Sequence, residues 1–106
     1  MRANNLTLLT DLYELTMMQG YFKNPTDQTV VFDMFYRDNP CGGGFAICAG
    51  LEQVIEYIEN LRFTDEDIEY LRGLSIFEED FLEYLRGFHF TGDIYAIPEG
   101  TVIFPR

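Results

Sequence analysis

The sequence has 106 residues, a formal net charge of −11 and 47 % hydrophobic residues, which suits one small folded domain and argues against a disordered chain. The charge opposes binding to nucleic acid or to an anionic membrane surface, because both require basic side chains near phosphates. No apolar run approaches the roughly 20 residues of a membrane span and no signal peptide precedes the polar N-terminus, so we expect a cytoplasmic protein.

The first predicted element is a helix in the segment LLTDLYELTMMQGYF, which begins at Leu8. Thr10 or Asp11 can accept hydrogen bonds from free backbone N–H groups, and Glu14 follows Asp11 at the spacing of a capping box. Gly20, which is followed by a proline a few residues later, is expected to end the helix.

This helix would carry large apolar side chains on nearly every side. The side chains concerned are Leu8, Leu9, Leu12, Leu15, Met17, Met18, Tyr21 and Phe22. A helix that is apolar all round is normally buried on every side, which one small core cannot achieve. We therefore expect a partner for it, most simply a second copy of the chain in a two-fold homodimer.

Strand and turn signals follow. QTVVFDMFYR, residues 28–37, alternates in polarity and is rich in β-branched and aromatic residues, which is typical of a strand. The next stretch predicts a tight turn at CGGGF and a short strand from Phe45 to Cys48, because the glycines lack the pattern of a phosphate-binding loop. Cys41 and Cys48 have no metal-ligand or redox spacing, so we interpret them as packing groups.

Three acidic helices are predicted between the strands. The first has one apolar face, made by Leu51, Val54, Ile55, Ile58 and Leu61. Capping-box spacing marks the start of the second at Thr64 and Asp67, and of the third at Ser75 and Glu78. The third helix is expected to turn Phe81, Leu82, Leu85 and Phe88 inward.

The final segment, FTGDIYAIPEGTVIFPR, predicts two extended runs about a Pro-Glu-Gly turn. The order of elements predicts an α+β fold of helices and antiparallel strands, with residues 1–106 as one N-terminal domain. Because the run from Val102 to Phe104 needs a strand partner and a cover, we expect the chain to be a fragment of a longer protein.

Few residues are candidates for chemistry. His89 is the only histidine and has no ligand or catalytic partner at a suitable spacing, so it is expected to be a packed or surface residue. Asp11, Tyr13 and Arg37 remain. From composition alone they would be a helix cap, a core aromatic and the solvent-side end of a strand.

Three segments, read in order, resemble the N-terminal region of nicotinate phosphoribosyltransferases. They are residues 8–22, residues 32–58 (FDMFYRDNPCGGGFAICAGLEQVIEYI) and residues 90–106. The T-D-x-Y helix, the F-x-R-x-x-P-x-G-G turn, the A-G-L helix start and P-E-G-T occur in this order. The related nicotinamide enzymes share a shorter T-D-x-Y and P-E-G signature.

The resemblance implies a reaction in the salvage synthesis of NAD. Such enzymes join nicotinate to phosphoribosyl pyrophosphate, giving nicotinate mononucleotide and pyrophosphate. Hydrolysis of ATP assists the reaction, and Mg²⁺ is expected as a cofactor beside ATP. Their N-terminal domain precedes a barrel-like α/β domain, and the active site forms across a homodimer interface. The phosphorylated histidine lies in the barrel and His89 does not match it. The chain alone is therefore expected to hold no catalytic residue, metal or cofactor, and to be inactive.

The resemblance also implies roles for three residues. Tyr13 matches the tyrosine that stacks on the pyridine ring, and Asp11 would lie beside the site. Arg37 matches an arginine that reaches a phosphate of the phosphoribosyl group across the dimer. The alternatives are a nicotinamide or quinolinate phosphoribosyltransferase, and an acidic interaction module without catalysis.

Overall fold

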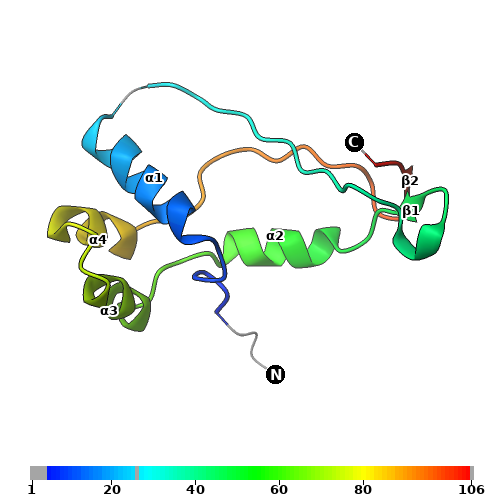
Figure 1. The fold of residues 1–106 in the computed structure, drawn as a ribbon. Coiled ribbons are helices and arrows are strands. Elements are labelled where there is room, and N and C mark those ends of the chain that lie inside the picture. Colours follow the sequence, from blue (N-terminus) through cyan, green and yellow to red (C-terminus); the bar gives the residue numbers. More distant parts are fainter. Residues whose placement is uncertain (1–4, 26, 106) are drawn as a thin grey trace. The chain divides into compact units, whose positions relative to one another are not determined.

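The computed structural model describes residues 5–25 and 27–105, which form four α-helices, a short 3₁₀ helix and one two-stranded antiparallel sheet (Figure 1). In chain order these are α1 (Leu12–Lys23), η1 (Pro40–Gly42), β1 (Ala46–Ile47), α2 (Leu51–Glu59), α3 (Asp65–Gly73), α4 (Glu79–Arg86) and β2 (Val102–Ile103). The predicted α+β class is confirmed. The described residues fall into two compact units, one from positions up to 27 and 57–91, the other from 28–56 and 92–105.

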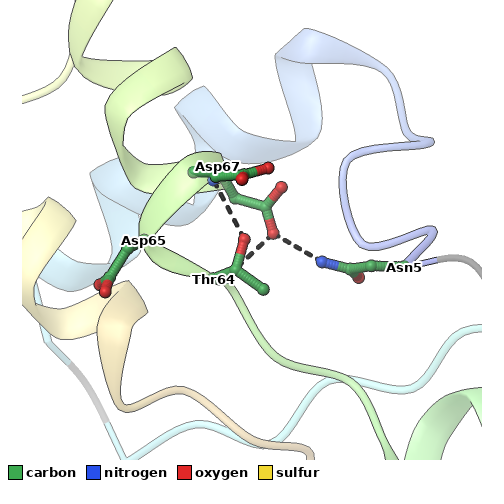
Figure 2. A pocket seen from close by; sticks show the side chains of 5 residues that line it. Asn5, Thr64, Asp65 and Asp67 are labelled. Atoms are coloured by element: carbon green, nitrogen blue, oxygen red, sulfur yellow. Dashed lines mark hydrogen bonds between the residues drawn. The ribbon is translucent and has the colours of Figure 1, made fainter.

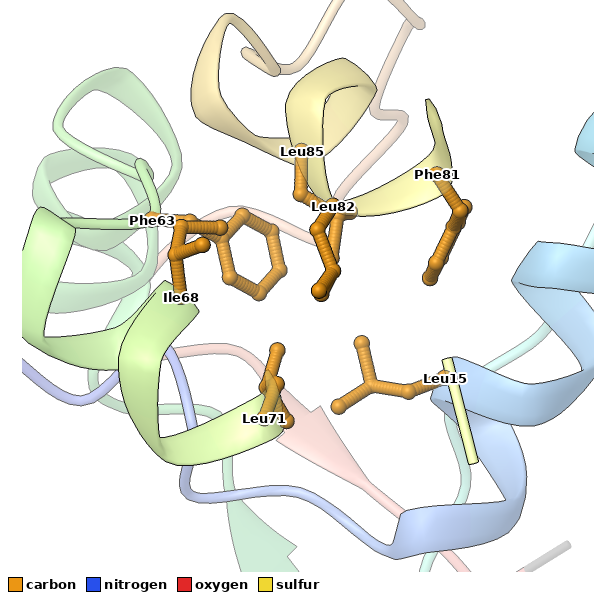
Figure 3. Packing of buried hydrophobic residues seen from close by; sticks show 7 residues of the cluster. All are labelled: Leu15, Phe63, Ile68, Leu71, Phe81, Leu82 and Leu85. Carbon is orange, nitrogen blue, oxygen red and sulfur yellow. The ribbon is translucent and has the colours of Figure 1, made fainter. Parts of the chain in front are cut away.

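The first unit is built on α3 and α4, which pack side by side (Figure 1). Its core, drawn in Figure 3, consists of buried hydrophobic side chains from three helices and the segment before α3. They are Leu15, Phe63, Ile68, Leu71, Phe81, Leu82 and Leu85. The predicted inward face of α4 is confirmed, with Phe88 packed partly against the core. Helix α1 contributes a single buried side chain, Leu15.

The start of α3 is the predicted capping box. The Thr64 Oγ1 accepts a hydrogen bond from the backbone N–H of Asp67 at 3.2 Å, and Asp67 Oδ2 accepts one from the backbone N–H of Thr64 at 2.9 Å. Asn5 Nδ2 also donates to Asp67 Oδ2 at 2.8 Å (Figure 2). Two backbone donors that an α-helix leaves free are thereby satisfied.

The predicted capping box of α4 is wrong. Glu78 occupies the N-cap position of α4, but its side chain makes no hydrogen bond to the free N–H groups of the first turn. Ser75 instead has a φ of 61° and donates its backbone N–H to the carbonyl of Arg72, so it belongs to the turn after α3. The spacing of Ser75 and Glu78 matched the motif, but a left-handed residue ends a helix and does not begin one.

Helix α1 begins after Asp11, as predicted, but its ends are formed differently. The Asp11 side chain makes no capping hydrogen bond, and Thr10 Oγ1 donates to the Glu14 carboxylate instead, so the predicted capping box is absent. Gly20 lies inside the helix, which continues to Lys23 and ends at Asn24. The residue that follows is a proline, and a helix usually ends before the residue that precedes one.

In the second unit the predicted strand over residues 28–37 is wrong. Residues 28–36 have no regular structure, and β1 pairs only with β2 among the described strands. The side chains of Val31, Phe32 and Met34 are almost fully exposed. Alternating polarity marks a sequence that can form a strand, but a strand also needs a hydrogen-bonding partner. The first extended run of the final segment lacks regular structure for the same reason.

The sheet itself is short. Ala46 pairs with Ile103 and Ile47 with Val102, so the strand predicted from Phe45 to Cys48 is shorter than expected. The predicted turn before it is confirmed as η1, in which Cys41 has a φ of 56°. Both cysteines are free thiols.

A carboxylate joins this sheet to α2. Glu99 accepts hydrogen bonds from the backbone N–H groups of Gly50 at 2.9 Å and Leu51 at 3.4 Å. The A-G-L and P-E-G-T motifs of the sequence therefore meet at the start of α2, where a negative charge is favourable for a helix. The predicted apolar face of α2 exists, but none of its residues is fully buried. No helix in the described ranges is both long and apolar enough to cross a bilayer.

Acidification is expected to weaken the ion pair between α1 and α4. The hydrogen bond from Lys23 Nζ holds the pKa of Asp80 below its ordinary value of 3.8. A carboxyl group with a lowered folded-state pKa stabilises the fold above its ordinary pKa, and this stabilisation is lost as the pH falls through the folded value. Asp80→Asn should therefore lower the Tm by more at about pH 7 than at about pH 2. The expected change in Tm is small because solvent screens the ion pair between Lys23 and Asp80.

Thermal unfolding of both proteins at the two pH values checks this expectation. The same pattern should hold for Glu79, whose pKa is lowered by the hydrogen bond from Arg72. A Tm difference between wild type and Asp80→Asn that is equal at both pH values would contradict the assigned role.

Candidate functional site

The first turn of α1 presents Tyr13 to solvent. Tyr13 is 59 % exposed, whereas Leu15, two residues later, is buried in the core of the first unit. Two residues span roughly 200° around a helix, so burying Leu15 turns Tyr13 outward. The structure thus excludes Tyr13 as a core aromatic of this chain. An exposed aromatic ring offers a flat apolar face to a flat ligand.

Tyr13 belongs to a larger exposed apolar surface, which we call the outer face of α1. It consists of Leu12, Tyr13, Met17 and Tyr21 on the helix together with Leu9 just before it, all of them about half exposed or more. Tyr13, Met17 and Tyr21 follow one another at intervals of four, which places them along one ridge of the helix. A contiguous exposed apolar patch of this kind usually marks an interaction site.

Asp11 lies immediately before this turn. Its backbone is extended, with a φ of −78° and a ψ of 142°, and its exposed carboxylate makes no capping hydrogen bond. A carboxylate at this position is favoured by the free N–H groups of the helix start. Its oxygens can therefore accept hydrogen bonds from a ligand or from another subunit without breaking a hydrogen bond to the start of the helix.

Arg37 belongs to the second unit, so it is described apart from Asp11 and Tyr13. Its side chain is exposed and makes no ion pair with any residue in the described part of the chain. The preceding residue is anchored: the Tyr36 hydroxyl lies 2.9 Å from the carbonyl of Ile103, to which it can donate, and 3.0 Å from Asn39 Oδ1. A guanidinium in this state presents its planar fork to solvent, as phosphate binding requires.

The hollow of about 450 Å³ at the start of α3 is a poor candidate for an anionic ligand. It is lined by Asn5, Thr64, Asp65, Glu66 and Asp67, and Figure 2 shows that the polar atoms of the capping box face one another there. Three carboxylates repel anions. Across positions 5–25 and 27–105, no three His, Cys, Asp or Glu side chains are grouped to hold a metal ion.

His89 is exposed, as expected of a surface residue. Its Nδ1 lies 3.4 Å from the carbonyl oxygen of Gly87, and no acidic or nucleophilic side chain of a described residue makes a hydrogen bond with it. Nothing in this geometry gives His89 a catalytic part.

Two polar side chains with clear structural roles escaped prediction. Gln19 makes two hydrogen bonds to the connection between α3 and α4, and Glu99 caps α2. The P-E-G-T motif was a signal for Glu99, but its partner at Gly50 lies far away in sequence. Gln19 carried no signal, because a glutamine on a helix is ordinarily a solvated residue.

Comparison with known proteins is consistent across nearly the whole chain. Residues 8–106 match the family model described as the nicotinate phosphoribosyltransferase (NAPRTase) N-terminal domain. The chain is 50 % identical over 99 residues to nicotinate phosphoribosyltransferase pncB2 of Mycobacterium tuberculosis, covering 93 % of this chain and 21 % of that protein.

Two further relatives carry the same name. The nicotinate phosphoribosyltransferase of Bacillus subtilis is 43 % identical over 104 residues, covering 97 % of this chain and 21 % of that protein. Nicotinate phosphoribosyltransferase 1 of Arabidopsis thaliana is 44 % identical over 102 residues, covering 93 % and 18 %. The chain thus spans about a fifth of the length of the curated relatives it matches.

Proposed function

The chain belongs to the nicotinate phosphoribosyltransferase family, and from this membership we propose that it is the N-terminal domain of an enzyme that joins nicotinate to phosphoribosyl pyrophosphate. The products are nicotinate mononucleotide and pyrophosphate, and the step serves the salvage synthesis of NAD. The observation that carries the proposal is the match of residues 8–106 to this one family. The enzyme would be about five times the length of this chain, as its relatives are.

Tyr13 is proposed to stack on the pyridine ring of nicotinate. Its exposure on the first turn of α1 supports this role, because the ring is free to meet a ligand. A stacked aromatic pair adds roughly 0.5–1.5 kcal/mol beyond the burial of its area. Asp11 would lie at the edge of the same site, where it orients the substrate or a neighbouring basic group.

Arg37 is proposed to contact a phosphate of the phosphoribosyl group. Its exposure and its lack of an ion pair among the described residues support this, since a guanidinium already paired with a carboxylate would first have to be released. We further propose a homodimer in which the outer face of α1 meets the partner subunit. Tyr13 and Arg37 would then each act in the active site of the partner. The exposed apolar side chains of that face supply the area that such an interface buries.

Binding of the anionic substrates and of ATP and Mg²⁺ is assigned to the rest of the enzyme. Nicotinate and phosphoribosyl pyrophosphate are anions, which a net charge of −11 repels. A basic pocket must therefore come from residues outside this chain. ATP and Mg²⁺ are proposed to act there too, as the resemblance to the family implies.

A substrate test with the complete enzyme decides among the possible reactions. We expect nicotinate and phosphoribosyl pyrophosphate to give nicotinate mononucleotide and pyrophosphate, faster when ATP and Mg²⁺ are present. Nicotinamide and quinolinate, offered in parallel at the same concentration, serve as matched controls and should react far more slowly. Preferential use of either one would overturn the proposed substrate. Absence of all three reactions would favour the non-catalytic interaction module.

A further inference from the structure

Helix α1 is attached to the rest of its unit by few groups. On the apolar side, Leu15 is buried in the core, and Leu8, Met18 and Phe22 pack partly against it. On the polar side, only Gln19 and Lys23 of α1 contact the α3–α4 pair among the described residues. The orientation of α1 therefore depends on a small number of contacts, all in the helix itself or just before it.

Gln19 makes the more specific of the two polar contacts. Its Oε1 accepts a hydrogen bond from the backbone N–H of Glu78 at 2.8 Å, and its Nε2 donates to the backbone carbonyl of Ile76 at 3.2 Å. One N–H donor and one carbonyl acceptor fix which end of the amide is oxygen and which is nitrogen. Both partner atoms belong to the main chain, and Glu78 is the residue that caps α4.

Lys23 makes a looser contact. Its Nζ lies 3.1 Å from Glu78 Oε2 and also contacts Asp80, and the side chains of both acids are more than half exposed. Exposed ion pairs adapt their geometry easily and are screened by solvent. Gln19, held between two main-chain atoms, is thus the more directional of the two polar contacts between α1 and the α3–α4 pair.

A tilt of α1 about Gln19 would displace Tyr13. The two residues are six positions apart on one helix, which is about 9 Å at a rise of 1.5 Å per residue. A tilt of about 10° about Gln19 would therefore move Tyr13 by roughly 1.5 Å. A displacement of about 1 Å in a group that orients a substrate can cost on the order of 100-fold in rate.

We propose that Gln19 is a positioning residue for Tyr13: its amide fixes α1 on the α3–α4 connection and so holds the Tyr13 ring in place against the pyridine ring of nicotinate. This rests on the proposed function, in which Tyr13 stacks on nicotinate. Gln19 touches no substrate and acts through the helix.

A double-mutant cycle in the complete enzyme tests the inference. Gln19→Met keeps the length and helix propensity of the side chain but removes both hydrogen bonds. It should raise the KM for nicotinate about 3- to 10-fold, because a misplaced Tyr13 ring loses most of its stacking energy, and leave the KM for phosphoribosyl pyrophosphate unchanged. Gln53→Met is the matched control, because Gln53 is an exposed glutamine on α2 without a hydrogen bond to another described residue. It should change neither constant.

The background with Tyr13→Ala separates positioning from a general structural role. Once the ring is gone, Gln19→Met should raise the KM for nicotinate no further, although it can still lower the Tm.

Each contrary result has its own meaning. An increase in KM that is equal with and without the Tyr13 ring would overturn the positioning role. So would a wild-type KM for Gln19→Met beside a raised KM for Tyr13→Ala, and in that case the stacking proposal stands. A wild-type KM for Tyr13→Ala would overturn the stacking role itself, and this inference with it.

Discussion

Tyr13→Ala is expected to raise the KM for nicotinate about 10- to 100-fold in the complete enzyme, from the lost burial of an aromatic ring and the lost stacking energy. The stability of the protein should change little, because Tyr13 is 59 % exposed and lies outside the core of the first unit. Steady-state kinetics with nicotinate varied at saturating phosphoribosyl pyrophosphate measures the effect.

Two further variants make this result specific to the ring at position 13. Tyr13→Phe keeps the stacking face and should have nearly the wild-type KM. Tyr70→Ala removes a tyrosine of similar exposure from α3, to which no part in the site is assigned, and should leave the KM unchanged. An Ala variant of Tyr13 with the wild-type KM would rule out stacking by this residue.

Phe81→Ala is expected to have the largest effect on stability, lowering the free energy of unfolding of the first unit by about 3–5 kcal/mol. Phe81 is fully buried, and its ring lies 5.8 Å from that of Phe22 on α1 and 5.7 Å from that of Phe77 before α4. Removing it leaves a cavity where α1 and α4 meet, and the surrounding side chains can only partly fill it. Urea unfolding followed by circular dichroism measures the loss.

Phe32→Ala is the matched control for this substitution. It removes the same side chain from a position that is 86 % exposed in the second unit, and should change the free energy of unfolding by less than about 0.5 kcal/mol. Equal losses for the two variants would mean that Phe32 is buried against another part of the protein in solution. A loss below about 1 kcal/mol for Phe81→Ala would contradict the assigned core.

Much of the helical part of the fold could be predicted because its signals are local. The Thr64 and Asp67 pair satisfies two backbone groups within one turn, so the start of α3 depends on nothing distant. The inward face of α4 follows likewise from the spacing of its apolar residues. Ser75 shows the limit of such reasoning, because its motif spacing was correct while its backbone conformation served the end of the preceding helix.

The candidate site was predictable only in part. A T-D-x-Y pattern identified Asp11 and Tyr13, but an apolar helix could equally have buried the tyrosine. The structure decided the point through Leu15, whose burial turns Tyr13 outward. The two hydrogen bonds from Gln19 to the connection before α4 had no sequence signal, because their partners lie 57 and 59 positions away along the chain.

What the sequence determined by itself were the features that a few neighbouring residues decide: the existence of four helices, the cap of α3, the turn at η1 and the apolar face of α4. Tertiary structure alone decided which strands pair and which faces are covered. Residues 28–37 have the alternation of a strand but no strand partner among the described residues, whereas Ala46 and Ile47 pair with Ile103 and Val102. The physical reason is that a helix satisfies its backbone hydrogen bonds within its own segment, whereas a strand must find its partners elsewhere in the protein.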